Sequence, residues 1–265
     1  MNSTKRRLEI YNKVITEKKV FIQELADMYK VSPMTIRRDL SILEKQRVVT
    51  MIYGGAYLND GAVGDLSFDL SKKKMKEEKL AIAYEASKYI KGGDSVYIGC
   101  GTTCHEITRF IKNERMIITT NSTMVVQSLE EKDKIDLVMV PGKFNRNSRA
   151  FFGTDSIDYI RKYYFDVAFL SPKYFDIYKG ATVIEDYDAK LNEAVIASSK
   201  RVYLLVDSEK FGKVSFVKYA DSSAFDIVLT DDKIDPTYVE QCKENLISIV
   251  IAQPMKKRDS VKISV

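Results

Sequence analysis

Apolar residues recur at helical spacing in three segments near the start of the chain. The three stripes comprise Leu8, Tyr11, Val14 and Ile15; then Ile22, Leu25, Ala26 and Tyr29; and then Ile36, Leu40 and Leu43. Steps of three and four residues place each stripe on one face of a helix. The pattern therefore predicts three short amphipathic helices within about fifty residues.

The start of the third helix is well specified. Ser32 is a favourable N-cap residue because its hydroxyl can accept a hydrogen bond from a free backbone amide, and Pro33 suits the first helical position. Thr35, Arg37 and Arg38 point away from the apolar stripe near the positive end of this helix. The short connection before it is typical of a helix-turn-helix, whose second helix enters the major groove of DNA.

The pattern then changes from helical to extended. Residues 48–53 predict a strand, and Gly54 with Gly55 suits a turn into residues 56–58. A pair of strands after a helix-turn-helix is the wing of a winged helix. We therefore expect a winged helix-turn-helix domain over residues 1–58.

The excess of basic charge lies in this part of the chain. Residues 1–50 contain eleven Lys or Arg and six Asp or Glu, a surplus equal to the formal net charge of +5 of the whole chain. A basic N-terminal domain on a balanced body fits binding to DNA phosphates. Adjacent arginines on a helix can also form an ordinary solvated face, but the cap, turn, stripe, wing and charge agree on DNA binding. Lys5 and Arg6 are further candidates for contact with the DNA backbone.

Seven short apolar runs alternate with helical patterns after residue 94. They cover residues 95–98, 116–119, 135–140, 166–170, 202–206, 226–229 and 247–251. This alternation predicts an α/β fold with a mostly parallel sheet. We expect this larger domain to span residues 76–255, after a linker at 59–75 and before a basic tail at 256–265.

Four loops at the carboxyl ends of these strands are candidates for a binding site, because ligands of parallel α/β sheets bind there. Their candidate groups are Gly101, Thr102 and Thr103; Thr120 and Asn121; Gly142 and Lys143; and Asp207 and Lys210. Backbone amides and hydroxyls can cradle a phosphate, and the lysines can pair with its charge. The second loop can equally act only as a helix cap. Taken together, the four loops predict a site for a phosphorylated ligand.

The composition argues against several other classes of protein. The sequence contains no long apolar run and no secretory signal, and its three cysteines form no disulfide framework, which favours a reducing cytoplasm and no membrane partner. Cys100, Cys104 and His105 are close in sequence, but their spacing matches no common zinc site. We predict neither a metal nor a cofactor.

The motif formed by Ser32, the run from Thr35 to Leu40, and Gly54, Gly55 and Ala56 resembles the signature of the DeoR family of bacterial transcriptional regulators. The resemblance continues through the Gly-Thr-Thr loop at 101–103 and the segment 206–212. It implies a winged helix-turn-helix followed by a sensor domain of the ribose-phosphate-isomerase-like type. It also implies a repressor of sugar or carbon-metabolism genes, which binds operator DNA as a symmetric homo-oligomer and responds to a phosphorylated sugar or similar metabolite.

The resemblance and the residue patterns together give two sets of candidate site residues. The DNA-binding set comprises Lys5, Arg6, Ser32, Met34, Thr35, Arg37, Arg38, Tyr53 and Gly54. The effector-binding set comprises Gly101, Thr102, Thr103, Thr120, Asn121, Gly142, Lys143, Asp207 and Lys210.

The chain departs from the family pattern at several of these positions. Tyr53 stands where the family usually has His, and Gly99 stands where it commonly has Asp. The kinship with isomerases leaves an enzyme as the alternative, in which a pocket carboxylate would shuttle a proton between sugar carbons. Gly99 removes one such carboxylate, and nothing in the sequence pairs Asp207 with Glu185. We therefore favour the regulator and expect no catalytic residue.

Overall fold

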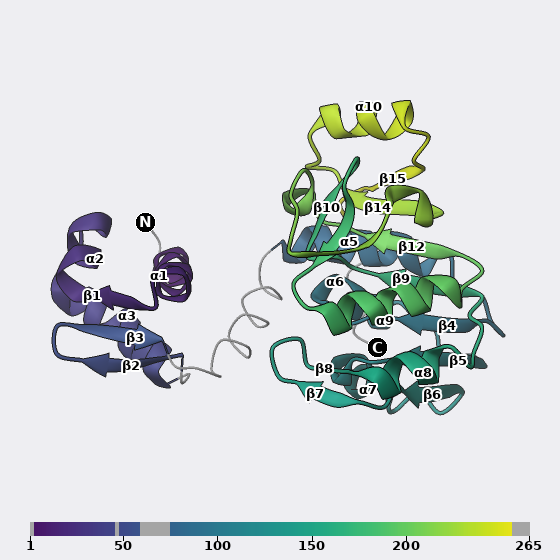
Figure 1. Cartoon of the computed structure of the whole chain (residues 1–265), viewed down its shortest axis with the longest axis horizontal. Coiled ribbons are helices and arrows are strands. Elements are labelled where there is room, and N and C mark those ends of the chain that lie inside the picture. Colours follow the sequence, from purple (N-terminus) through teal and green to yellow (C-terminus); the bar gives the residue numbers. More distant parts are fainter. Residues whose placement is uncertain (1–2, 46–47, 59–74, 256–265) are drawn as a thin grey trace. The chain divides into compact units, whose positions relative to one another are not determined.

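The computed structural model describes residues 3–45, 48–58 and 75–255, except for the side chain of Ile15. Nearly all of the expected linker and the whole expected tail lie outside the described residues. The chain divides into two compact units, residues 1–73 and 74–265 (Figure 1). Within the described ranges, no helix is long and apolar enough to cross a lipid bilayer.

The described part of unit 1 (residues 1–73) contains helices and a small antiparallel sheet. Its elements are α1 (Ser3–Glu17), β1 (Lys19–Phe21), α2 (Ile22–Tyr29), α3 (Pro33–Lys45), β2 (Val49–Ile52) and β3 (Gly55–Leu58). The strands pair in the order β1-β3-β2. The three predicted helices and the two wing strands are confirmed, whereas the three-residue β1 is too short for the pattern to predict.

The core of unit 1 follows the predicted stripes closely. Ile36, Leu40 and Leu43 of α3 are buried. In α1 the stripe differs from the prediction, because Ile10 is fully buried while Leu8 is only half-buried. The apolar face of α1 is therefore rotated toward Ile10.

Two glycines shape the wing for different reasons. Gly54 has a φ of 77°, a conformation that side chains rarely adopt, and lies in the turn with Tyr53. Gly55 already belongs to β3, one residue earlier than predicted. A Cβ at Gly55 would lie 2.2 Å from the carbonyl oxygen of Val20, so the close pairing of β1 with β3 requires glycine there.

Unit 2 (residues 74–265) is built on a seven-stranded parallel sheet. Its strands are β4 (Ser95–Ile98), β5 (Met116–Thr120), β6 (Ile135–Met139), β9 (Val167–Leu170), β12 (Val202–Leu205), β14 (Ile227–Asp231) and β15 (Ile249–Ala252). They lie in the order β15-β14-β12-β9-β4-β5-β6. All seven predicted strands are confirmed, as is the parallel α/β class.

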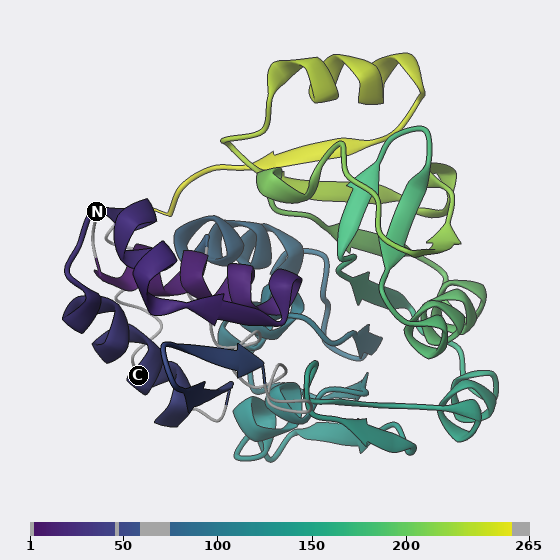
Figure 2. The ribbon, with the colours of Figure 1, turned by 60° about the vertical axis from the view of Figure 1, so that its left-hand side comes forward.

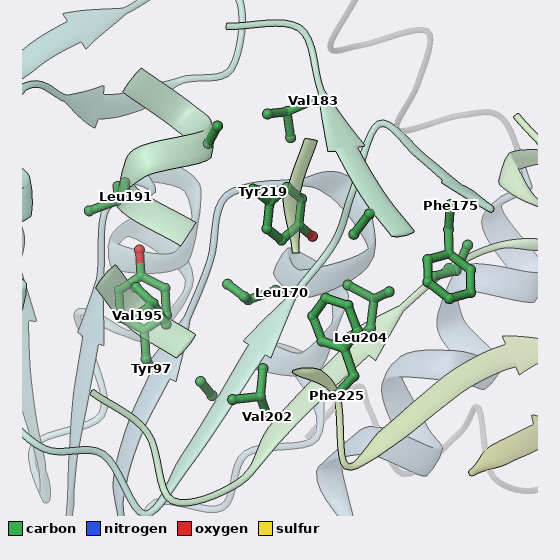
Figure 3. Packing of buried hydrophobic residues seen from close by; sticks show 14 of the residues in the cluster. Tyr97, Leu170, Phe175, Val183, Leu191, Val195, Val202, Leu204, Tyr219 and Phe225 are labelled. Carbon is green, nitrogen blue, oxygen red and sulfur yellow. The ribbon is translucent and has the colours of Figure 1, made fainter. Parts of the chain in front are cut away.

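Helices cover both faces of this sheet (Figure 1). They are α5 (Lys76–Ser87), α6 (Thr102–Glu106), α7 (Thr123–Leu129), α8 (Thr154–Ile160), α9 (Asp186–Ala197) and α10 (Pro236–Glu244), with 3-10 turns η1 (Ile107–Arg109), η2 (Ser208–Lys210) and η3 (Ser222–Ala224). Alternate strand residues belong to separate buried clusters. Tyr97, Leu170 and Leu204 pack with Leu191 and Val195 of α9 (Figure 3).

Two small antiparallel sheets in unit 2 are not predicted by the sequence pattern. One pairs β7 (Lys143–Asn145) with β8 (Ala150–Phe152), and the other contains β10 (Tyr174–Asp176), β11 (Gly180–Val183) and β13 (Val217–Ala220). Figure 2 shows β10 and β11 as neighbouring arrows. Polar residues or glycine interrupt most of these short strands, as in β7 and β11, so no continuous apolar run marks them.

Candidate DNA-binding face and effector site

Helix α3 begins with the predicted cap. The amide of Thr35 donates to Oγ of Ser32 at 3.2 Å, and the two hydroxyl oxygens lie 2.9 Å apart. Lys30, between α2 and α3, adopts the left-handed conformation with a φ of 51° and keeps the turn short. The cap and the turn together fix where α3 begins.

Most of the predicted DNA-binding residues lie on the surface of unit 1. Arg37 and Arg38 of α3 are exposed, as are Ser32, Gly54 and Lys5. The side chain of Met34 is 69% exposed and Tyr53, at the tip of the wing, is fully exposed. Thr35 is half-buried beside its cap. The exposed part of α3 thus carries two guanidinium groups on the side opposite its apolar stripe.

Arg6 differs from the other residues of this set because it is buried. Its Nε donates to Oδ2 of Asp39 at 2.7 Å, and both residues are less than 8% exposed. Nε of Arg7 lies 3.6 Å from the other carboxylate oxygen of Asp39. The guanidinium of Arg6 therefore joins α1 to α3 inside the domain, and the structure does not present it to a DNA backbone.

In unit 2, the loops after β4, β9 and β12 come together. Nζ of Lys210 donates to Oγ of Ser171 at 3.2 Å and to the carbonyl of Pro172 at 3.0 Å, and lies 3.8 Å from Oδ2 of Asp207. Gly101 has a φ of 134°, and a Cβ there would lie 3.4 Å from Cβ of Ser171. Gly101, Asp207 and Lys210 are therefore neighbours around the loop at Ser171.

The hydroxyl and amide groups after β5 are used inside the protein. Oγ1 of Thr120 donates to the carbonyl of Ile98 at 2.6 Å, and Asn121 accepts from the Tyr97 hydroxyl at 3.2 Å. Both Thr120 and Asn121 are fully buried, as is Thr103 in α6. These side chains hold the loops in position. They do not act as the helix cap that the sequence left open as an alternative, because α7 begins after Ser122 without a side-chain cap hydrogen bond.

The loop after β6 continues directly into the β7–β8 hairpin. Gly142 has a φ of 147°, and a Cβ there would lie 2.3 Å from Oγ of Ser156. Lys143 is exposed at the start of β7, and no contact among the described residues joins it to Lys210. Gly142 therefore lies in a loop as predicted, whereas Lys143 already begins a strand and stands apart from the cluster at Ser171.

One acidic residue within electrostatic range of Cys100 is missed by the sequence analysis. Asp188, in the first turn of α9, is partly buried and accepts a hydrogen bond from Nδ2 of Asn192 at 3.0 Å. Burial, together with the charge of Glu185, raises the pKa of Asp188 to about 7. Burial and the charge of Asp188 in turn raise the pKa of the buried Tyr219, whose hydroxyl has no partner among the described residues.

Cys100 lies within electrostatic range of Asp188, and Cys104 lies within electrostatic range of Lys210. Burial and then the charge of Asp188 raise the pKa of Cys100, while burial raises the pKa of Cys104 to about 12 against an opposing effect of Lys210. Both thiols therefore stay neutral at physiological pH. Gly101 lies between these cysteines in the chain, so the charges of Asp188 and Lys210 both act on this loop.

The thiols and the histidine flagged in the sequence belong to the core of unit 2. Sγ of Cys104 donates to the carbonyl of Phe169 at 3.6 Å, and Nε2 of His105 lies 3.0 Å from Oγ of Ser128. Among the residues that the structure describes, no group of three or more His, Cys, Asp or Glu is arranged to hold a metal ion.

Sequence models of two known domains match the chain. The DeoR-like helix-turn-helix domain matches residues 6–62, and the DeoR C-terminal sensor domain matches residues 74–232. The chain belongs to the DeoR family. The resemblance drawn from the signature motif is thereby confirmed, with the domain order that it implies.

Several DeoR-family relatives are similar over nearly their whole length. The glycerol-3-phosphate regulon repressor of Escherichia coli strain K12 is 29% identical over 87% of this chain and 92% of its own. The lactose phosphotransferase system repressor of Lactococcus lactis is 28% identical over 91% and 96%. Among solved structures, ribose 5-phosphate isomerase A from Methanocaldococcus jannaschii has 18% identity and a TM-score of 0.38, over 52% of this chain and 55% of its own.

Arg6 offers a test of how this DeoR-family domain holds its recognition helix. We expect Arg6→Met to lower the free energy of unfolding by roughly 3 kcal/mol, because it leaves the buried Asp39 carboxylate without its main partner. Urea denaturation measures this loss. The slope of log affinity against log salt for DNA should not change, since no phosphate contact is removed.

The matched control for this test is the exposed neighbour Lys5. Lys5→Met should leave the stability unchanged and, if Lys5 contacts a phosphate, reduce the salt slope by about 0.9. The opposite pattern for Arg6→Met, a normal stability with a reduced slope, would show that Arg6 binds DNA.

Asp188 predicts a specific pH dependence of stability. Because its pKa is raised from 3.8 to about 7 on folding, the folded state binds more protons than the unfolded state between these values. Its contribution to stability is present below about pH 4 and is lost as the pH rises through 7. Asp188→Asn should therefore gain about 3 kcal/mol of stability relative to the wild type as the pH rises from 5 to 8.

Asp186→Asn is the control, because Asp186 is exposed on the same helix and pairs with Lys190 at the surface. Thermal melts of both variants from pH 5 to pH 8 provide the measurement. Parallel profiles for Asp188→Asn and the wild type would refute the raised pKa.

Proposed function

We propose that this protein is a transcriptional repressor of genes for sugar or related carbon metabolism. It binds operator DNA through unit 1, and a phosphorylated sugar or similar metabolite bound to unit 2 changes its affinity for DNA. The names of its relatives support this proposal, since they include repressors of a glycerol-3-phosphate regulon and of a lactose phosphotransferase system.

The exposed cations of α3 are the observation that carries the DNA-binding role. Arg37 and Arg38 follow a capped helix start and have no carboxylate partner among the described residues. Surface guanidinium groups left unpaired on a recognition helix are suited to bidentate contacts with guanine or to phosphate contacts. The exposed Tyr53 at the wing tip adds a polar aromatic group beside the turn at Gly54.

A symmetric homo-oligomer is part of this proposal. Each unit 1 offers one recognition helix, and helix-turn-helix proteins gain specificity by placing two such helices in successive turns of the major groove. A ligand that binds the two arrangements of these helices with different affinity acts as a switch.

The cluster at the carboxyl edge of the sheet supports an anionic, hydroxylated effector. Lys210 supplies a cation beside the backbone of Gly101, and Asp188 supplies an oxygen acceptor for sugar hydroxyls. This acceptor comes from α9, so it does not depend on the carboxylate that Gly99 replaces before the Gly-Thr-Thr loop. We place the phosphate near Lys210 and the hydroxyls near Asp188.

The enzyme alternative gains no support from the two acids named from the sequence. Asp207 lies near Lys210, whereas Glu185 accepts hydrogen bonds from Nδ2 of Asn145 at 3.1 and 3.2 Å. They belong to different elements and face different partners. The named functions of the relatives likewise favour a regulator.

Loss of one recognition-helix arginine should weaken specific binding. A preferred duplex is first selected from a random library, and its affinity is then measured by fluorescence anisotropy against random competitor. We expect Arg38→Ala to bind this duplex about 10- to 100-fold more weakly, as for the loss of a base contact. Lys190→Ala, which removes an exposed cation of unit 2, is the control. Failure of the wild type to prefer any duplex would end the proposal.

Loss of Lys210 should abolish the response to the effector. Fructose 1-phosphate, glycerol 3-phosphate, ribose 5-phosphate and inorganic phosphate are tested for shifts in melting temperature and for release of the selected duplex. A responding probe should lose its effect in Lys210→Met and keep it in Lys213→Met, whose lysine is exposed in the same loop region. An equal response of both variants would remove Lys210 from the site, and silence of every probe would remove the sugar-phosphate effector but not the DNA-binding role.

A further inference from the structure

A groove in unit 2 is lined by residues other than those of the cluster at Ser171. It has a volume of about 1110 Å³ and is bordered by α5, by α6 with η1, by α7 and by the segment that leads into β5. None of the candidate effector residues lines it. Binding of the proposed effector therefore does not account for this groove.

The charged lining of this groove is mainly basic. It contains Lys88, Arg109, Lys112 and Lys132, against the single carboxylate of Glu114. Lys88 pairs with Glu85 and Arg109 with the buried Glu106, neither of which lines the groove. Lys112 and Lys132 have no carboxylate partner among the described residues.

Lys132 is the most informative of these cations. The residue is half-buried, its ammonium group donates to the carbonyl of Ile111, and burial lowers its pKa. A partly desolvated cation that contacts only a neutral carbonyl retains unused hydrogen-bond donors. An anion in the groove would satisfy these donors and compensate the charge.

The two loops that carry the unpaired lysines are tied together. Nδ2 of Asn113 donates to Oδ1 of Asp133 at 2.8 Å, and the amide of Lys134 donates to Oδ1 of Asn113 at 3.1 Å. These bonds and the contact of Lys132 with Ile111 hold the basic end of the groove in one arrangement. Such preorganisation reduces the entropy lost when a ligand binds.

The wall formed by α5 and the residue after η1 is aromatic. The rings of Tyr84 and Phe110 pack edge to face at 5.4 Å, and Nζ of Lys88 lies 5.0 Å from the centre of the Tyr84 ring. Tyr84 remains 39% exposed, so part of its ring is available to a ligand. Aromatic walls favour planar rings, through stacked or edge-to-face contacts.

We propose that this groove binds a nucleoside phosphate, with the base against Tyr84 and Phe110 and the phosphate near Lys112 and Lys132. The cations of the lining match the phosphate of such a molecule, and the aromatic wall matches its base. The ligand would touch α6 from its C-terminal side at His105, while the loop at Gly101 precedes the same helix. The groove thus provides a second ligand site in the sensor unit, independent of the proposed sugar-phosphate site.

Isothermal titration of the full-length protein with AMP tests this proposal, with adenosine and inorganic phosphate as the separate parts of the ligand. We expect AMP to bind more tightly than either part. Lys132→Met should weaken AMP binding at least tenfold, and Lys134→Met, an exposed change two residues away, should not alter it. Tyr84→Ala should weaken the binding of AMP but not that of phosphate. Thermal melts verify that each variant is folded.

Three outcomes would overturn the proposal. The first is a wild type that does not bind AMP at millimolar concentration, and the second is a folded Lys132→Met variant that binds AMP as the wild type does. The third is AMP binding that Lys210→Met abolishes and Lys132→Met retains, because this would place AMP at the carboxyl edge of the sheet. None of these outcomes bears on DNA binding or on the response to sugar phosphates.

Discussion

Burial of both faces of the parallel sheet is the constraint on which unit 2 depends. Neighbouring residues of one strand, such as Val96 and Tyr97, enter separate buried clusters. Both faces must therefore be covered, and parallel strands in such a sheet are joined by crossover connections. All seven strands then point the same way and their loops gather at one edge. The site around Lys210 is a consequence of that geometry.

Unit 1 depends on a smaller set of directed interactions. The cap at Ser32 sets the start of α3 from within its own sequence, whereas Asp39 fixes α3 against α1 through Arg6. The same helix exposes Arg37 and Arg38 to solvent. Of these consecutive residues, Asp39 thus holds the helix in place, while Arg37 and Arg38 offer positive charge to a partner.

These interactions also explain how far the sequence could predict the structure. Strands such as β4 and β9 are marked by continuous apolar runs because both of their faces are buried. The strand β11 carries no such mark, since it depends on its close approach to β13, where a Cβ at Gly180 would lie 2.0 Å from the carbonyl oxygen of Ala220. The sequence predicts Arg6 to be a surface cation, because its partner Asp39 lies 33 residues away in the chain. Likewise, Asp188 is one of several acids at the start of α9, and the sequence does not show that burial in the fold raises its pKa.

Burial therefore decides what each charge in this protein can do. The Arg6 guanidinium, paired and enclosed, cannot reach a ligand, while Lys210 keeps an ammonium group at an edge where loops from three strands meet. Lys132 stands between these cases, because it is half-buried yet bonded only to a carbonyl. A cation in that position is stabilised by an incoming anion more than a fully solvated lysine would be, because less water screens the pair. A basic side chain is thus structural, functional or incompletely satisfied according to the partners that the fold provides.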